Sequence, residues 1–114
     1  MLRSTMQRIA TPTAILVGLS DDLAEMCQQV LADGAIRVLR VGHVAAAAER
    51  IPVTMPQLIV VSTLMPAHEF DTLNDRCVAV GAEVLRIDPD TSDRATAALV
   101  RTAARNALLK ALGS

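Results

Sequence analysis

The chain has 114 residues, which is enough for one domain that buries a core without disulfides or metal ions. Hydrophobic residues make up 52% of it and aromatic residues only 1%, so the core has to be aliphatic, and the sequence offers no set of rings on which bases or sugars could stack. The 11 basic and 12 acidic residues give a formal net charge of -1 without a polybasic tract, which excludes nucleic acid as a partner of this domain alone.

The sequence shows no signal for export or for membrane insertion. Its first residues lack the apolar run of a signal peptide. No segment reaches the roughly 18 apolar residues of a spanning helix. We therefore expect a cytoplasmic protein that does not bind the membrane. Cys27 and Cys77 fall at apolar positions of predicted helices, which is typical of free, buried thiols.

The predicted elements begin after residues 1–12, which show no hydrophobic period and predict a flexible N-terminal arm. Residues 13–17 form a short apolar run, typical of a strand buried on both faces. Ser20 or Asp21 can then cap a helix whose apolar residues recur at helical spacing until Gly34 ends it. The chain therefore starts with a strand followed by a helix.

The same alternation continues in the next segment. Residues 35–41 predict a second strand, in which Arg37 and Arg40 indicate a sheet edge protected by charge from unwanted pairing. Residues 43–51 predict a short, alanine-rich helix that Pro52 closes.

The second half of the chain adds two further units. Residues 58–61 are the most apolar run and predict a central parallel strand. A helix over residues 69–80 ends at Gly81, and residues 82–87 predict a fourth strand. Four strand–helix units of this length predict an α/β domain over residues 13–114, a three-layer sandwich around a four-stranded parallel sheet.

The last helix, predicted from Asp93 to Leu112, has two apolar sides. One side suits packing against the sheet, and a second apolar patch contains Leu99 and Leu109. These two leucines either pack inside the monomer or meet a partner.

Two stretches give this order of elements a family resemblance. Residues 56–66, PQLIVVSTLMP, resemble the receiver-domain segment PDLILLDLMMP, in which the second aspartate accepts a phosphoryl group. Residues 81–89, GAEVLRIDP, resemble the later receiver segment GADDYLxKP. The chain is thus similar to the receiver domains of two-component response regulators, which implies a flavodoxin-like sheet of order 2-1-3-4. A complete receiver has five βα units, so one unit is missing between the two segments and the fold is truncated.

The resemblance also implies that the phosphorylation chemistry has been lost. Receivers bind a divalent cation through acidic residues at the end of the first strand, where this chain has Gly18 and Leu19. The phosphoacceptor position holds Ser62, the lysine position Asp88 and the aromatic switch position Leu85. A leucine cannot ligate a hard cation, and an aspartate in place of the lysine repels a phosphoryl group. We expect a degenerate pocket without catalytic residues, metal or cofactor, in a protein that is not an enzyme.

The expected function is a non-phosphorylatable adaptor that binds other signalling proteins in a bacterial, two-component-like system. Receivers commonly associate through their last strands and helices, so the resemblance places the interaction surface on Arg86, Leu99, Arg101, Arg105 and Leu109. A homodimer that covers the sheet edge or the same helix is a further expectation.

A second interpretation rests on four aspartates near the expected strand ends: Asp21, Asp22, Asp88 and Asp90. Open α/β folds bind ligands at this edge, so a sensor of a small molecule, nucleotide or cation is the alternative function. The same aspartates equally suit helix N-termini and turns. His43 and His68 lack partners at zinc-ligand spacing and are expected to be solvated loop residues.

Overall fold

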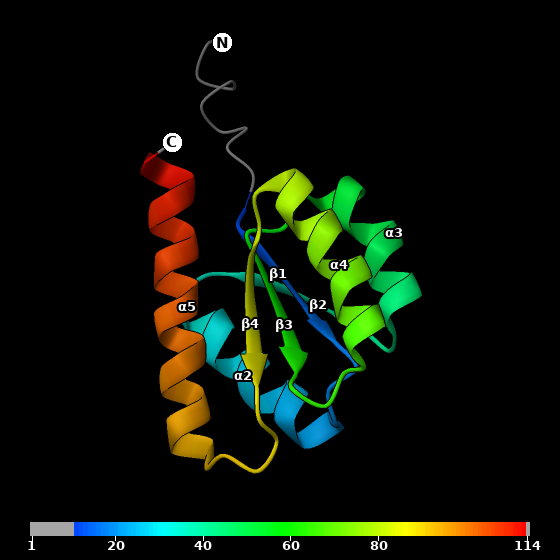
Figure 1. Cartoon of the computed structure of the whole chain (residues 1–114). Coiled ribbons are helices and arrows are strands. Elements are labelled where there is room, and N and C mark those ends of the chain that lie inside the picture. Colours follow the sequence, from blue (N-terminus) through cyan, green and yellow to red (C-terminus); the bar gives the residue numbers. More distant parts are fainter. Residues whose placement is uncertain (1–10, 114) are drawn as a thin grey trace, which may run out of the picture.

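The computed structural model describes residues 11–113, so residues 1–10 of the predicted arm lie outside the described residues. Strands and helices alternate along the whole described chain (Figure 1). In order, the elements are β1 (Thr13–Val17), α2 (Asp21–Asp33), β2 (Arg37–Val41), α3 (Val44–Thr54), β3 (Leu58–Ser62), α4 (Ala67–Val80), β4 (Glu83–Ile87) and α5 (Asp93–Gly113). Every predicted strand and helix is present, which confirms the four strand–helix units.

The four strands form a parallel sheet of order β2-β1-β3-β4. This is the predicted flavodoxin-like, receiver-like order 2-1-3-4. β3 pairs directly with β4, with Val60 opposite Leu85 and Ser62 opposite Ile87. A complete receiver has a fifth strand in its sheet. This sheet has four strands, so β4 is both the neighbour of β3 and an edge of the sheet.

Two helices cover each face of the sheet, which makes the fold a three-layer sandwich (Figure 1). Successive residues of a strand point to opposite faces. Leu16 and Val60 accordingly pack with α2 and α5, whereas Ile15 and Ile59 pack with α3 and α4. All four are buried, so the two central strands are apolar on both faces, as predicted.

The two cysteines occupy opposite layers. Cys27 of α2 and Cys77 of α4 are free thiols, and both are fully buried. Burial disfavours the thiolate and raises the pKa of each thiol to about 11. This confirms the prediction that both behave as small core residues.

The end of α3 differs from the prediction. Pro52 does not close this helix, which continues to Thr54. A proline removes one backbone N–H, but the next turn still forms, because the N–H of Met55 donates to the carbonyl of Ile51 at 2.8 Å. Met55 then ends the helix in the left-handed conformation, with φ 49°. The predicted stop was therefore too early.

The loop between α2 and β2 also differs in detail. Gly34 caps α2 as predicted, but with φ -92°, and the left-handed residue is Ala35, with φ 63°. The N–H of Ile36 then donates to the carbonyl of Leu31 at 3.0 Å. This turn buries Ile36 in the core. β2 therefore begins at Arg37, two residues later than expected.

Candidate functional site

The receiver-type phosphorylation positions lie at the carboxyl end of the sheet, where the strand order reverses between β1 and β3. Gly18 and Leu19 follow β1, and Ser62 is the last residue of β3. All three line one cavity of about 440 Å³. Gly18 has φ 65° and its N–H donates to the carbonyl of Val41 at 2.9 Å, so this turn needs a glycine.

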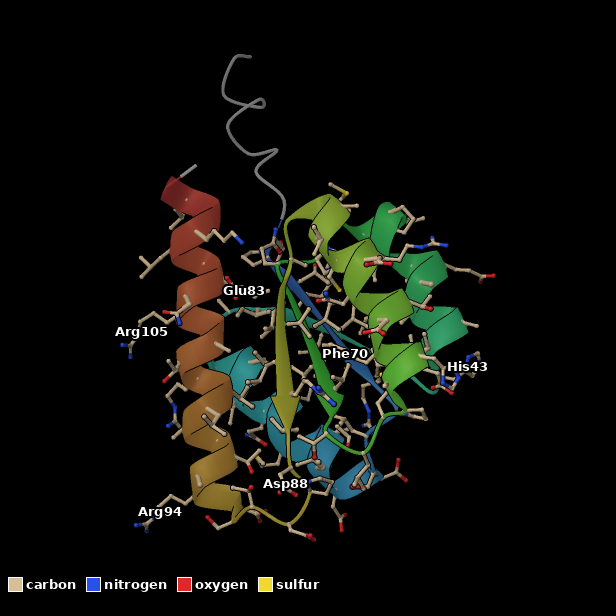
Figure 2. The ribbon with its side chains drawn as sticks, in the orientation of Figure 1. His43, Phe70, Glu83, Asp88, Arg94 and Arg105 are labelled. Atoms are coloured by element: carbon tan, nitrogen blue, oxygen red, sulfur yellow. The ribbon has the colours of Figure 1, made fainter. Side chains whose placement is uncertain are left out.

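The other two predicted pocket residues do not line this cavity, although Asp88 follows β4 at the same end of the sheet, next to the lining residue Pro89. Asp88 is exposed in the loop after β4 (Figure 2), and its carboxylate accepts the N–H of Asp90 at 2.9 Å, which closes a turn. Leu85 packs against the core between the sheet and the layer of α2 and α5. The structure thus brings together three of the five residues and gives the remaining two a turn and a core position.

The surroundings of Ser62 do not resemble a phosphorylation site chemically. Its Oγ accepts the N–H of Leu64 at 3.0 Å, and its carbonyl accepts the N–H of Met65 at 3.1 Å. Among the described residues that line the cavity, Glu69 is the one carboxylate and no lysine or arginine is present. A receiver-type transfer needs several carboxylates around Mg²⁺ and a cation for the phosphoryl oxygens.

The aspartates at this end of the sheet do not converge. Asp21 and Asp22 lie in the first turn of α2, whose N-cap Ser20 accepts the N–H of Leu23 at 3.3 Å. Asp21 also pairs with Arg40 at 3.3 Å. Within residues 11–113, no three His, Cys, Asp or Glu side chains gather closely enough to hold a metal ion. The aspartates therefore serve the start of α2 and the turn after β4.

The histidines were expected in solvated loops, and one of them has a structural role instead. Nδ1 of His43 accepts the N–H of Ala46 at 3.3 Å and caps α3. An accepting Nδ1 carries no proton, so the proton of the neutral ring lies on Nε2. His68 is exposed as predicted, but it lies in the first turn of α4 and not in a loop, with its Nε2 4.0 Å from Oε2 of Glu69. Sequence reasoning missed the cap because serine, threonine, aspartate and asparagine usually fill this position.

The residues of the predicted interaction surface separate into two groups. Leu99, Arg101, Arg105 and Leu109 are all exposed on α5. Leu99 is 46% exposed and Leu109 is 59% exposed, so neither packs inside the monomer. Arg86 belongs to the other side of the sheet. The structure therefore does not support one continuous surface of all five.

Arg86 is held by α4 and not by α5. Its guanidinium lies 4.3 Å from the centre of the Phe70 ring, over which it stacks. Its Nη2 lies 3.5 Å from the carbonyl oxygen of Thr63. Glu83 lies three residues before Arg86 in β4 and points to the opposite face of the sheet. Its carboxylate pairs with Lys110 of α5 at 3.6 Å.

The outer side of α5 carries a basic row. Six exposed residues recur at helical spacing along this side, and we call them the arginine face of α5: Arg94, Ala98, Arg101, Arg105, Leu109 and Leu112. Figure 2 shows Arg94 and Arg105 extending from α5 away from the sheet. None of the three arginines pairs with an acidic residue of the described chain. A row of cations next to leucines is thus left open to a partner.

Comparisons with known proteins address the fold. No family model and no curated protein matches the sequence. The signal receiver domain of a protein described as a LuxO repressor from Vibrio parahaemolyticus aligns with a TM-score of 0.61 and 19% identity, over 92% of this chain and 98% of that domain. The pseudo-receiver domain of the CikA protein aligns with a TM-score of 0.53 and 10% identity, over 82% of this chain and 97% of that domain.

A designed protein gives a similar score. A de novo Rossmann 2x3 fold aligns with a TM-score of 0.55 and 14% identity, over 71% of this chain and 63% of that one. At such identities the likeness concerns the fold, and the fold is a receiver-like, flavodoxin-like α/β sandwich. No helix between residues 11 and 113 combines the length and the apolar character that a membrane crossing requires.

Proposed function

We propose that this chain is a receiver-like adaptor that is not phosphorylated and acts by binding another signalling protein. It is a binding module and not an enzyme, and it works in the bacterial cytoplasm in a two-component-like system. The receiver-like fold supports a role in signalling of the two-component type. Leu19 at the cation position and the exposed Asp88 at the lysine position support the loss of phosphoryl transfer.

The observation that carries the proposal is the arginine face of α5. Exposed arginines without acidic neighbours form charge-assisted hydrogen bonds with carboxylates, and the adjoining leucines offer apolar contact. Arginine is also enriched in the core of protein interfaces. The partner that fits both features is an acidic amphipathic helix, with leucines facing Leu109 and Leu112 and glutamates facing Arg101 and Arg105.

The same charges bear on the expected homodimer. A two-fold axis through the arginine face would set Arg101 and Arg105 of one copy against the same residues of the other. Like charges in contact repel, so this face is unsuited to self-association. A homodimer has to use another surface, and the free edge of β4 is the remaining proposal.

Loss of phosphoryl transfer is tested with acetyl phosphate and Mg²⁺, followed by mass spectrometry of the intact chain. We expect no phosphoryl adduct, under conditions in which a genuine receiver domain used as a positive control is modified. An adduct on this chain, above all an acid-labile one, would contradict the proposal.

Binding through α5 is tested with a synthetic helical peptide that carries a leucine row flanked by glutamates. Fluorescence anisotropy should show binding that weakens as salt is raised, because exposed charge pairs are screened. Arg101→Glu/Arg105→Glu should weaken it by about tenfold or more, which corresponds to about 1.4 kcal/mol.

The matched control is Arg50→Glu/Arg76→Glu, which makes the same charge change on exposed positions of α3 and α4. This control should bind almost as well as the unmodified chain. Equal losses in both double variants would mean that only the overall charge matters. A peptide with lysines in place of the glutamates should not bind, and tighter binding of that peptide would exclude the proposed partner.

A further inference from the structure

The cavity between the ends of β1 and β3 is used neither by the proposed adaptor surface nor by a phosphoryl group. Its volume of about 440 Å³ falls within the range of small-molecule sites. It also lies where the strand order reverses, which is where open α/β sheets bind ligands. Its lining is mainly apolar, with side chains that include Leu19, Leu23, Val44, Leu64, Met65 and Pro66.

The polar groups of the lining favour a particular kind of ligand atom. Ser20 and Ser62 both line the cavity. Each Oγ already accepts a backbone N–H, from Leu23 at 3.3 Å and from Leu64 at 3.0 Å. The hydroxyl protons remain available for donation. A ligand therefore gains hydrogen bonds here by presenting an acceptor oxygen.

The charges of the lining favour a neutral ligand. No lysine or arginine is among the described lining residues, and Glu69 contributes a negative charge. The other titratable side chain of the lining is His43, whose Nδ1 is used by the cap of α3, so phosphates, nucleotides and carboxylates find no permanent cation among the described lining residues. A bare divalent cation also lacks ligands, since the described residues gather no group of three suitable side chains.

The geometry points to a binding site for a small uncharged molecule with an apolar body and a ketone, ether or alcohol oxygen. The apolar body fills the space beside Leu19, Val44 and Met65, and the oxygen accepts hydrogen bonds from Ser62 and Ser20. This site goes beyond the adaptor function and does not depend on it, because no residue of α5 lines the cavity. The chain then acts as a sensor for a neutral ligand, and not for a nucleotide or a cation.

The test uses two fluorescent probes of similar size that differ in charge. Prodan is an uncharged naphthyl ketone, and anilinonaphthalene sulfonate is an anion. Prodan should bind with a blue shift of its emission. The affinity of the sulfonate should be lower by about tenfold or more. In the amide spectrum of the isotope-labelled chain, prodan should shift Gly18, Leu19 and Leu64. Failure of prodan to bind up to its solubility limit would overturn the proposal.

Two variants locate the site. A Cβ built on Gly42 meets nothing within 4 Å, and its φ is not positive, so Gly42→Leu adds a side chain beside the cavity without backbone strain. We expect prodan binding to weaken about tenfold or more. Ala32→Leu, on the exposed surface of α2, is the matched control for added apolar surface and should bind prodan like the unmodified chain.

Ser62→Ala keeps the cavity open and removes one donor to the ligand, together with the oxygen that accepts the N–H of Leu64. It should weaken prodan binding by about threefold to tenfold, the usual effect of one hydrogen bond. If Gly42→Leu fails to fold, as circular dichroism would show, the amide shifts and Ser62→Ala still decide the question. Unchanged affinity in Ser62→Ala together with shifts away from Gly18 and Leu64 would place prodan elsewhere and overturn the site.

Discussion

Thr96 lies in the first turn of α5 with its side chain in the core. It is 1% exposed, and its Oγ1 has no hydrogen-bond partner among the described residues. A buried hydroxyl without a partner costs the folded state the hydrogen bonds that water offers it in the unfolded state. This residue is therefore a local weak point in an otherwise aliphatic core.

We expect Thr96→Val to raise the free energy of unfolding by about 1 kcal/mol, because the shape is kept and the desolvated hydroxyl is removed. Urea denaturation measures the change. Thr102→Val, at an exposed position of the same helix, should change stability by no more than about 0.5 kcal/mol. A loss of stability in Thr96→Val would show that the hydroxyl is bonded in solution.

The two buried thiols predict how stability depends on pH. In the folded chain their pKa is about 11, against an ordinary value of 9.0. A raised folded pKa means that the stabilisation is complete below pH 9.0 and is lost as pH rises toward about 11, since the unfolded chain releases these protons first. Urea midpoints across this range should fall.

The double variant Cys27→Ala/Cys77→Ala isolates this effect. Its overall stability will be lower because the core loses volume, but its stability should decline less steeply above pH 9.0. Parallel curves for the two chains would show that other groups cause the decline. Alkylation of the native chain at neutral pH should also be slow, because the thiols are buried and protonated.

Among the elements, α3 has the clearest local defect. Pro52 lies inside the helix and cannot donate the hydrogen bond that its position would supply to the carbonyl of Ala48. We expect Pro52→Ala to stabilise the fold by about 1–3 kcal/mol, the upper end applying to an interior helical position. The thermal or urea midpoint reports this gain. Val53→Ala, at an exposed neighbour, should change little, and a destabilised Pro52→Ala would mean that the proline ring has a packing role.

Most of the element order was predictable because its signals are local. Apolar runs and helical spacing identified the strands and helices, and Ser20 and Gly81 marked ends where the structure has them. The helix and strand ends that were predicted wrongly depend on how the folded chain packs and not on local sequence signals. Ala35 takes a left-handed conformation so that Ile36 reaches the core, and no local residue preference indicates this.

The candidate site was predictable in part, for a similar reason. Gly18, Leu19 and Ser62 meet because parallel strands end at the same edge, which the strand order alone implies. Arg86 was predicted to share a surface with α5. Its neighbour Leu85 packs toward that helix, so Arg86 points to the opposite face, toward α4. Adjacent strand residues point to opposite faces, but only the folded chain shows which face α5 covers.

For the whole molecule, the distribution of charge matters more than its sum. The formal net charge is -1, yet the arginine face of α5 presents three cations on one side. Such a molecule is nearly neutral at long range and strongly basic at one surface, which favours acidic partners at close approach.

We therefore expect the chain to resist self-association through α5. At low salt, light scattering should give either the monomer mass of 12.1 kDa or a dimer that Arg101→Glu/Arg105→Glu leaves unchanged. If raising the salt concentration produced a dimer that Arg101→Glu/Arg105→Glu changed, α5 would be the contact and the partner argument would be wrong. A dimer that those substitutions leave unchanged would instead support the edge of β4 as the contact.

The four-strand order also sets where the backbone is best protected from solvent. β1 and β3 are paired along both sides, whereas β2 and β4 each keep one side open. Every interior strand therefore touches an edge strand, and a single detachment at either end exposes the middle of the sheet. We therefore expect the slowest amide-deuterium exchange in β1 and β3, the two strands that are hydrogen-bonded along both sides.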